Sequence, residues 1–300
     1  MVRCYNKTMK NIIKQIKKGQ LNLSGKVVAV SGSTGGIGRE LCRYLAKMGA
    51  ELILLDRNPK RSEALEAELT ASFPELSVRR ITVDLEDISA VRAAADELEG
   101  IGIDYLVLNA GAYSIPRHAC STGYDNVFMI NFVSPYCLAR RLLPTVKARG
   151  GRIVAVGSIA HNYSRIDPDD LDFSTRTRAS LVYGNAQRHL MYSFYALDGE
   201  AIAVTHPGIT QTNITAHYPK LIYALIKYPM RLIFMRPRKA CLSILCGLFV
   251  PCAENEWIGP RFFDVWGMPN KKLLKTATAE ESAKIRARAD SVFCETISKV

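Results

Sequence analysis

The sequence VVAVSGSTGGIGREL, residues 27–41, predicts a buried strand, a glycine-rich turn and the start of a helix. We expect Gly32 to allow the tight turn out of the strand, Gly36 to let the backbone approach a pyrophosphate, and Gly38 to let the helix pack closely on the sheet. The first turn of such a helix offers free N–H groups and a partial positive charge to phosphates. The turn therefore predicts a dinucleotide site.

Short apolar runs alternate with stretches of helical length along the rest of the chain. RSEALEAELTASF (61–73) and ISAVRAAADELEG (88–100) are two of the expected helices. Continuous apolar strands separated by helices are typical of a parallel sheet covered on both faces. The predicted fold class is therefore α/β, a single Rossmann-type, doubly wound parallel sheet with helices on both faces. Strands are expected at 27–30, 52–55, 77–83, 105–108, 153–156 and 202–205.

Asp56 closes the second expected strand, 18 residues after Gly38. A carboxylate at this place bonds the adenosine ribose hydroxyls and repels a 2′-phosphate, so it favours NAD over NADP. Arg57 follows directly, and an arginine is the usual partner of that phosphate. NADP therefore stays open as the less favoured cofactor.

Two basic segments carry the whole net charge of +12. Residues 1–20 and residues 217–252 each hold six Lys or Arg and no acidic residue. Both also contain apolar residues, among them Ile12, Ile13 and Ile16, and basic amphipathic segments are typical of an anionic membrane surface or a partner helix. A solvated helix face is the alternative. Nucleic-acid binding is not predicted, because no binding motif accompanies the charge.

The chain is expected to have a basic amphipathic N-terminal arm over residues 1–20 and one main domain over residues 21–300. Its eight cysteines include no Cys-x-x-Cys pair and no zinc-ligand spacing, which predicts reduced thiols and no metal site. Neither an export signal nor a membrane-spanning run of about 18 apolar residues is expected. The predicted location is the cytoplasm, with peripheral membrane contact through the two basic segments as a further hypothesis.

Seven motifs follow one another along the chain and together resemble the short-chain dehydrogenase/reductase family. They are SGSTGGIG (31–38), DL (84–85), NAG (109–111), Asn131, Ser158, the helix around Tyr183, and HPG (206–208) with Thr212. Within that family the chain most resembles the retinol dehydrogenase and WW-domain oxidoreductase branch. The similar features are the 25-residue interval from Ser158 to Tyr183 and the segments IAHNYSRID (159–167), PRKACLSILCGL (237–248) and GPRFFDVWG (259–267). The resemblance covers residues 21–296.

The resemblance implies hydride transfer between a nicotinamide cofactor and a carbonyl or alcohol. Tyr183 would be the acid/base group, Ser158 would polarise the substrate oxygen, and Asn131 would hold a relay water. The apolar segment 209–250, a substrate lid in relatives, implies a hydrophobic substrate that is retinoid-, steroid- or lipid-like. A homodimer or homotetramer is implied as well. Besides Asp56 and Arg57, the implied cofactor contacts are Gly32, Ser33, Gly36, Ile37 and Gly38 at the pyrophosphate, Asp84 and Leu85 at the adenine, Asn109, Ala110 and Gly111 in the cleft, Tyr183 and Gln187 at the nicotinamide ribose, and Pro207, Gly208, Ile209 and Thr212 at the carboxamide.

Gln187 departs from the family pattern, which has a lysine four residues after the tyrosine. Its amide can bond a ribose hydroxyl but supplies no charge to lower the tyrosine pKa, so Tyr183 is expected to titrate near its ordinary pKa of about 10. Arg188 is turned about 100° around the helix and should point elsewhere. Two functions remain open: a weak, reduction-biased oxidoreductase, and a catalytically silent dinucleotide-binding module for interaction or sensing.

Overall fold

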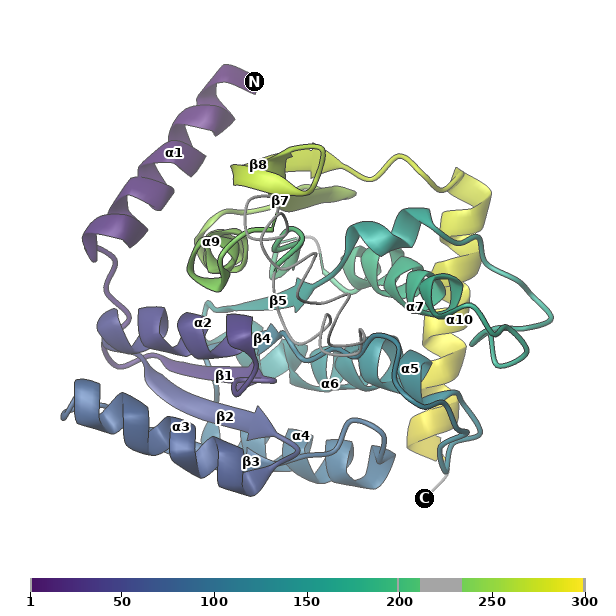
Figure 1. Cartoon of the computed structure of the whole chain (residues 1–300), viewed down its shortest axis with the longest axis horizontal. Coiled ribbons are helices and arrows are strands. Elements are labelled where there is room, and N and C mark those ends of the chain that lie inside the picture. The colour runs from purple at the N-terminus through teal and green to yellow at the C-terminus, as the bar shows by residue number, and fades with distance from the viewer. Residues whose placement is uncertain (1, 199, 211–233, 299–300) are drawn as a thin grey trace, which may run out of the picture.

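The computed structural model describes residues 2–198, 200–210 and 234–298 and contains one eight-stranded sheet (Figure 1). The strand order is β3-β2-β1-β4-β5-β6-β7-β8, and every neighbouring pair is parallel except β7–β8. The order reverses between β1 and β4, the place where doubly wound sheets bind their ligands. The strands are β1 (Val27–Ser31), β2 (Glu51–Asp56), β3 (Val78–Thr82), β4 (Tyr105–Leu108), β5 (Arg152–Val156), β6 (Ile202–Thr205), β7 (Glu256–Phe262) and β8 (Trp266–Leu273).

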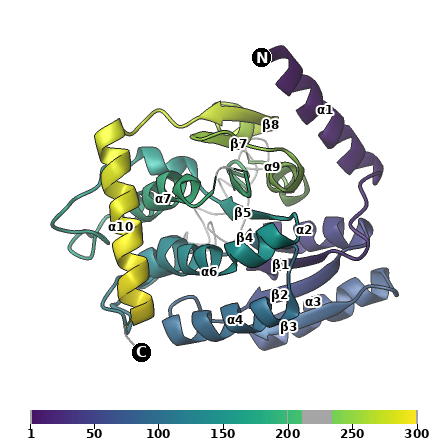
Figure 2. The same ribbon diagram turned by 180° about the vertical axis from the view of Figure 1, so that it is seen from behind.

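Helices cover both faces of the sheet (Figure 1 and, from behind, Figure 2). On one face α2 packs against α3 and α9, and on the other α4 packs against α6. α10 crosses α7 and α6 at the outside of the second layer. The helices are α1 (Val2–Lys18), α2 (Gly36–Lys47), α3 (Pro59–Ser72), α4 (Ile88–Ile101), α5 (Asn126–Phe128), the π-helical turn η1 (Met129–Val133), α6 (Ser134–Ala148), the 3₁₀ turn η2 (Ile159–Asn162), α7 (Ala179–Ser193), the 3₁₀ turn η3 (Phe194–Ala196), α9 (Pro237–Phe249) and α10 (Ala279–Ser298).

The central strands are apolar on both faces because helices cover both of them. Val28, Ala29 and Val30 of β1 and Leu106 and Val107 of β4 are fully buried. Each of the six expected strands is present, with bounds within one residue of those expected. The predicted α/β fold of Rossmann type is confirmed.

The β7–β8 hairpin was not predicted, and it adds one antiparallel pair at the edge of the expected parallel sheet. β7 joins β6 in parallel through Thr205 and Ile258, whereas β8 runs antiparallel along β7. Glycine and proline inside EWIGPRF weaken its strand pattern, and the pairing register shifts beyond Pro260. Phe263 and Asp264 of the hairpin loop have φ angles of 51° and 60°, in the left-handed region.

The basic N-terminal segment forms a helix, α1, that packs against the main domain. Its apolar residues Met9, Ile13 and Ile16 are buried, and α1 contacts α9 and β8. Figure 1 shows α1 at one edge of the molecule, beside the β8 end of the sheet. These side chains therefore belong to the hydrophobic core, and the apolar face of the basic segment packs against α9 and β8 of the same chain.

The expected substrate lid over residues 209–250 is only partly described. Residues 211–233, with Thr212, lie outside the described residues, as does much of the basic segment 217–252. α9 forms the end of the segment, and Cys241, Ile244 and Leu245 in it are fully buried against the sheet. This part is core rather than lid. Within the described residues, none of the helices combines the length and the hydropathy needed to span a bilayer.

Candidate active site

Two predicted cofactor segments, residues 31–38 and 109–111, are hydrogen-bonded to each other at the carboxyl edge of the sheet. The Ser31 hydroxyl accepts from the backbone N–H groups of Asn109 and Ala110 at 3.0 and 3.1 Å. The Asn109 amide donates to the Ser31 and Gly32 carbonyl oxygens at 3.1 and 3.0 Å. These bonds hold the glycine turn against the loop that follows β4.

Gly32 and Gly38 occupy positions where no side chain fits. Gly32 has a φ angle of +63°, and a Cβ atom there would lie 2.8 Å from Ala110 Cα. A Cβ atom on Gly38 would lie 2.2 Å from the Gly32 carbonyl oxygen. α2 begins at Gly36 after the N-cap Gly35, which has no side chain to bond the first N–H groups. Those groups can therefore bind an anionic ligand.

Asp56 lies at the end of β2 as predicted, but its carboxylate is directed into the glycine turn. Oδ1 accepts from the backbone N–H and the hydroxyl of Thr34, each at 3.1 Å. Oδ2 accepts from the hydroxyls of Ser33 and Ser62. These four bonds fill the acceptor positions of the carboxylate, whose residue is only 5% exposed. Asp56 therefore fixes the turn, and a direct bond to a ribose requires an exchange of partners.

The residues predicted on the adenine side lie together at the ends of β2 and β3. Asp84 accepts from the Glu86 backbone N–H at 3.0 Å, and Leu85 is buried. The exposed Arg57 guanidinium forms an ion pair with Glu86, with 3.2 Å between Nη1 and Oε1. Because Glu86 already balances its charge, Arg57 is a weakened partner for a 2′-phosphate.

Asn131 joins the loop after β4 to the π-helical turn η1. Its Oδ1 accepts from the Ala112 N–H at 3.0 Å, and its Nδ2 donates to the carbonyls of Ala112 and Val127 at 2.9 and 2.7 Å. A Cβ atom on Gly111 would lie 3.0 Å from Oδ1, so the loop passes closely over the amide. π-helical turns inside helices are frequent at functional sites. Asn131 thus holds the loop in place, and both of its amide atoms already have partners.

The Ser158 and Tyr183 side chains lie close enough for the serine hydroxyl to influence the pKa of the phenol. Ser158 follows β5 and caps η2, with its Oγ accepting from the Ala160 N–H at 3.2 Å. Burial, the largest effect, raises the pKa of Tyr183 above its ordinary value. The nearby Ser158 hydroxyl lowers this pKa in part, and the Tyr113 and Tyr163 hydroxyls raise it. The pKa is thus higher than the value near 10 expected from the sequence, because burial adds to the missing positive charge.

Gln187 lies one helical turn after Tyr183 on α7 and is buried. Its Oε1 atom has no hydrogen-bond partner among the described residues. A ribose hydroxyl has the chemistry to donate to this oxygen, although Asn185 Oδ1 and His189 Nε2 on the same helix also lack a partner among the described residues. The neighbouring Arg188 points away, as predicted, and pairs with Glu281.

The predicted carboxamide loop packs against the β7–β8 hairpin. Gly208 has a φ angle of +84°, and a Cβ atom there would lie 2.6 Å from the Val265 carbonyl oxygen. The Ile209 N–H donates to the same carbonyl at 3.2 Å. Pro207 is buried, and burial lowers the pKa of its neighbour His206 to about 4. The hairpin that the sequence did not predict therefore shapes one wall of the site.

Tyr113 is a site residue that the sequence analysis missed. Its ring packs edge-to-face on Tyr183, with 5.3 Å between ring centroids. Its position two residues after the NAG motif (109–111) could have indicated a place near the cofactor. No helical or strand pattern, however, predicts its contact with Tyr183. Tyr113 adds an aromatic wall beside the predicted acid/base group.

A cavity of about 830 Å³ opens next to the glycine turn, from Gly36 along α2 to residues 234–238. Four of its lining residues are basic, namely Arg43, Lys47, Arg236 and Arg238. Arg236 and Arg238 come from the basic segment 217–252, so this part of the segment lines a cavity rather than an amphipathic helix face.

The residues present suit a dinucleotide. The glycine turn leaves room and N–H donors for the pyrophosphate, and Gln187 offers an unpartnered buried oxygen on α7. The neighbouring Ser158 and Tyr183 hydroxyls provide the chemistry that carbonyl reduction needs.

Comparison with known proteins agrees with this geometry. Residues 26–167 match the family model described as short chain dehydrogenase. Polyprenol dehydrogenase from Mus musculus is 26% identical over 255 residues, which are 79% of this chain and 75% of that protein. Retinol dehydrogenase 12 from Mus musculus is 29% identical over 205 residues, which are 65% of each chain.

A solved structure has the same fold. L-sorbose reductase from Gluconobacter frateurii, determined with NADPH and L-sorbose, has a TM-score of 0.60 and 23% identity, over 76% of this chain and 92% of that one. At this identity the likeness shows the fold alone. The matched family model and the related dehydrogenases show what the chain resembles: it is similar to members of the short-chain dehydrogenase/reductase family.

Proposed function

We propose that the protein is an NAD(P)-dependent oxidoreductase that reduces a carbonyl on a hydrophobic substrate and oxidises the corresponding alcohol poorly. The observation that carries the proposal is the proximity of the Ser158 and Tyr183 side chains, with the unpartnered Gln187 oxygen one helical turn after Tyr183 on α7. A protein that only binds a dinucleotide has no need to bring these groups together.

Tyr183 would act as the general acid. With its pKa raised, the phenol is protonated at neutral pH and donates its proton to the substrate oxygen as negative charge develops there. Ser158 donates a second hydrogen bond to the same oxygen and polarises the carbonyl. The nicotinamide cofactor, when bound, supplies the hydride.

Gln187 would hold the nicotinamide ribose without changing the charge of the site. Its Oε1 would accept a hydrogen bond from a ribose hydroxyl, which would give this unpartnered buried oxygen a donor. An amide carries no charge and stabilises no phenolate. Alcohol oxidation needs that phenolate as its base, so the proposed enzyme favours reduction.

NAD is the proposed cofactor, with NADP less favoured. The buried Asp56 carboxylate places negative charge beside the turn, and Arg57 is paired with Glu86. Both features act against a 2′-phosphate. The L-sorbose reductase structure was determined with NADPH, so relatives of this fold accept the phosphorylated cofactor as well.

A hydrophobic substrate is proposed from the names of the relatives. Polyprenol and retinol, the alcohols in those names, are long apolar molecules with one hydroxyl. A retinoid-, steroid- or lipid-like carbonyl is therefore the substrate class to screen first.

The test titrates the purified protein with NADH and NADPH and then screens apolar aldehydes and ketones. Tyr183→Phe should lower turnover by about 10²- to 10⁴-fold while leaving NADH affinity nearly unchanged. Tyr113→Phe is the matched control, because it removes a neighbouring hydroxyl and keeps the ring. Dinucleotide binding without turnover of any carbonyl would contradict the proposal and favour the silent binding module, and absence of binding would contradict both.

A further inference from the structure

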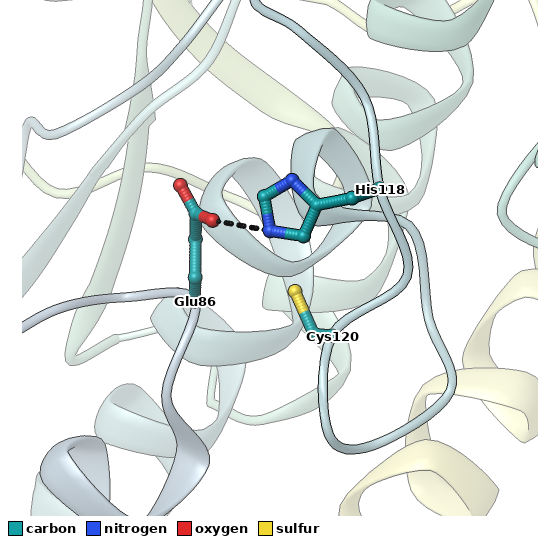
Figure 3. A group of neighbouring side chains, drawn as sticks. All are labelled: Glu86, His118 and Cys120. Carbon is teal, nitrogen blue, oxygen red and sulfur yellow. Dashed lines mark ion pairs between the residues drawn. The ribbon is translucent and has the colours of Figure 1, made fainter.

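Three side chains with metal-binding atoms meet at the rim of the predicted adenine site (Figure 3). Glu86 lies in the loop between β3 and α4, and His118 and Cys120 lie in the loop between β4 and α5. Glu86 Oε2 lies 2.9 Å from His118 Nε2, and one ligand atom from each of the three residues lies within 4.8 Å of the other two. In Figure 3 the Cys120 sulfur points toward the Glu86–His118 pair.

We propose that Glu86, His118 and Cys120 bind one Zn²⁺ ion, with water as the fourth ligand. One thiolate, one imidazole and one carboxylate are the three donor types that zinc accepts in proteins. Tetrahedral bonds of about 2.0–2.3 Å place ligand atoms roughly 3.3–3.8 Å apart, so small side-chain rotations bring the three groups to bonding distance. The His118 side chain is 57% exposed, which leaves it free to make such a rotation.

The far side of the His118 ring has a partner that can orient it. Nδ1 lies 3.2 Å from Asn126 Nδ2. Asn126 is itself held in place, because its Nδ2 also donates to the Pro116 carbonyl at 3.0 Å and its Oδ1 accepts from the His118 backbone N–H at 3.4 Å. Metal-bound histidines commonly have such a second partner.

Three carboxylates act on the Cys120 sulfur, those of Glu86, Asp125 and Asp84. Asp125 is paired with Arg117 at 2.8 Å, so Glu86 and Asp84 are the carboxylates that attract a cation most. Arg57 pairs with the Oε1 oxygen of Glu86, so Oε2 is the oxygen directed at the site. A bound Zn²⁺ would offset this negative charge and take the place of the Glu86–His118 contact.

The zinc site would join two loops and take no part in the proposed hydride transfer. None of its three ligands is a predicted cofactor or catalytic residue. The loop that carries His118 and Cys120 begins at the cleft wall, residues 109–111, whereas Glu86 follows the Asp84–Leu85 pair. The cysteine spacing gave no sign of the site, because Glu86 precedes His118 by 32 residues. Zn²⁺ should therefore stabilise the folded chain whether or not the chain is an active enzyme.

The experiment uses the full chain, freed of metal with a chelator and then titrated with Co²⁺ and with Zn²⁺. We expect one equivalent of Co²⁺ to bind with a thiolate-to-cobalt charge-transfer band in the near ultraviolet, and Zn²⁺ to displace it and raise the melting temperature. Cys120→Ser should abolish the band, and His118→Ala should weaken Zn²⁺ affinity by about 100-fold or more. Cys294→Ser, which removes an exposed thiol of α10, is the control and should change neither.

Circular dichroism of the metal-free variants checks that they fold, so that a lost band reports a lost ligand. The proposal is overturned if the unmodified chain binds no Zn²⁺ at micromolar concentration. It is equally overturned if Cys120→Ser and His118→Ala bind Co²⁺ with the same band and affinity as the unmodified chain.

Discussion

Arg188 and Glu281 form a two-pronged ion pair, with Nε–Oε1 and Nη2–Oε2 distances of 2.7 Å each. The guanidinium is almost fully buried and also donates to the carbonyls of His161 and Thr276 at 2.9 and 2.8 Å. The pair fastens α10 to α7. The only positive charge adjacent to Gln187 in the sequence therefore stabilises the fold, and it cannot replace the missing lysine.

Loss of this pair should destabilise the domain. Arg188→Met removes the bidentate partner of the partly buried Glu281 carboxylate. We expect the free energy of unfolding, measured in urea, to fall by about 3–5 kcal/mol. Arg165→Met is the matched control, because the exposed Arg165 contacts the same carboxylate at 3.4 Å. Its loss should lower the free energy of unfolding by less than about 1 kcal/mol. Equal stabilities of the two variants would contradict this assignment.

The same pair predicts sensitivity to acid. Burial acts to raise the pKa of Glu281, but the Arg188 hydrogen bonds and charge outweigh it, and the net pKa lies below the ordinary value of 4.5. A lowered carboxyl pKa contributes stability above the unfolded-state pKa, and this contribution is lost as pH falls through the lower folded-state pKa. We therefore expect the free energy of unfolding to fall less between neutral and acidic pH in Glu281→Gln than in the unmodified protein, as measured by denaturation at a series of pH values.

Asp56 should determine cofactor preference by charge rather than by a direct bond. We expect NADH to bind about tenfold tighter than NADPH, a difference of about 1.4 kcal/mol, measured by fluorescence titration. Asp56→Asn keeps the shape and removes the charge, so it should narrow this gap. Asp56→Ala also deletes the bonds to Ser33 and Thr34 and should weaken both cofactors. Equal affinities of the unmodified protein for NADH and NADPH would contradict this role of Asp56 and would indicate that Arg57 offsets its charge.

The outer face of α1 should bind anionic vesicles by charge alone. Lys10, Lys14 and Lys17 are exposed, whereas the apolar face of the helix is buried. Replacing the three by Gln should weaken co-sedimentation with phosphatidylserine vesicles by about 1 kcal/mol per residue, and added salt should do the same. Lys284→Gln on the distant α10 is the control. A lack of binding at low salt would leave α1 as a solvated, structural helix.

Sequence patterns predicted the sheet well where strands are continuous and apolar. β1, β2, β4, β5 and β6 were identified because they are apolar and almost entirely buried. β3 is an exception, since Arg79, Arg80 and Thr82 are exposed and only Ile81 is buried. β7 and β8 were missed, since Pro260, Gly259 and the exposed Phe262 interrupt any two-residue periodicity. Their pairing depends on the whole sheet rather than on local sequence.

The candidate site was predictable in position but not in contacts. The order of motifs located the glycine turn, Asn131, Ser158 and Tyr183, because each follows the end of a strand or lies on the next helix. The inward bonds of Asp56 and the packing of Tyr113 on Tyr183 depend on which way side chains turn after folding. The Glu86–His118 contact joins separate loops, and no spacing rule anticipates it.

Gln187 is the residue that most distinguishes this site, and its exchange for lysine tests the account. In Gln187→Lys the ammonium should lower the pKa of Tyr183, because a positive charge stabilises the phenolate. The oxidation rate at neutral pH should then rise by about tenfold or more, since each pKa unit corresponds to about 1.4 kcal/mol. Gln187→Met, similar in size and uncharged, controls for the loss of the amide.

The most direct measurement is the pH profile of alcohol oxidation by the unmodified protein and Gln187→Lys, with the alcohol produced from a carbonyl that the protein reduces. The account predicts that oxidation by the unmodified protein rises only toward alkaline pH, and that the profile of Gln187→Lys is displaced to lower pH while reduction near neutrality persists in both. Superimposable profiles, or an unmodified protein that oxidises the alcohol fully at neutral pH, would contradict it.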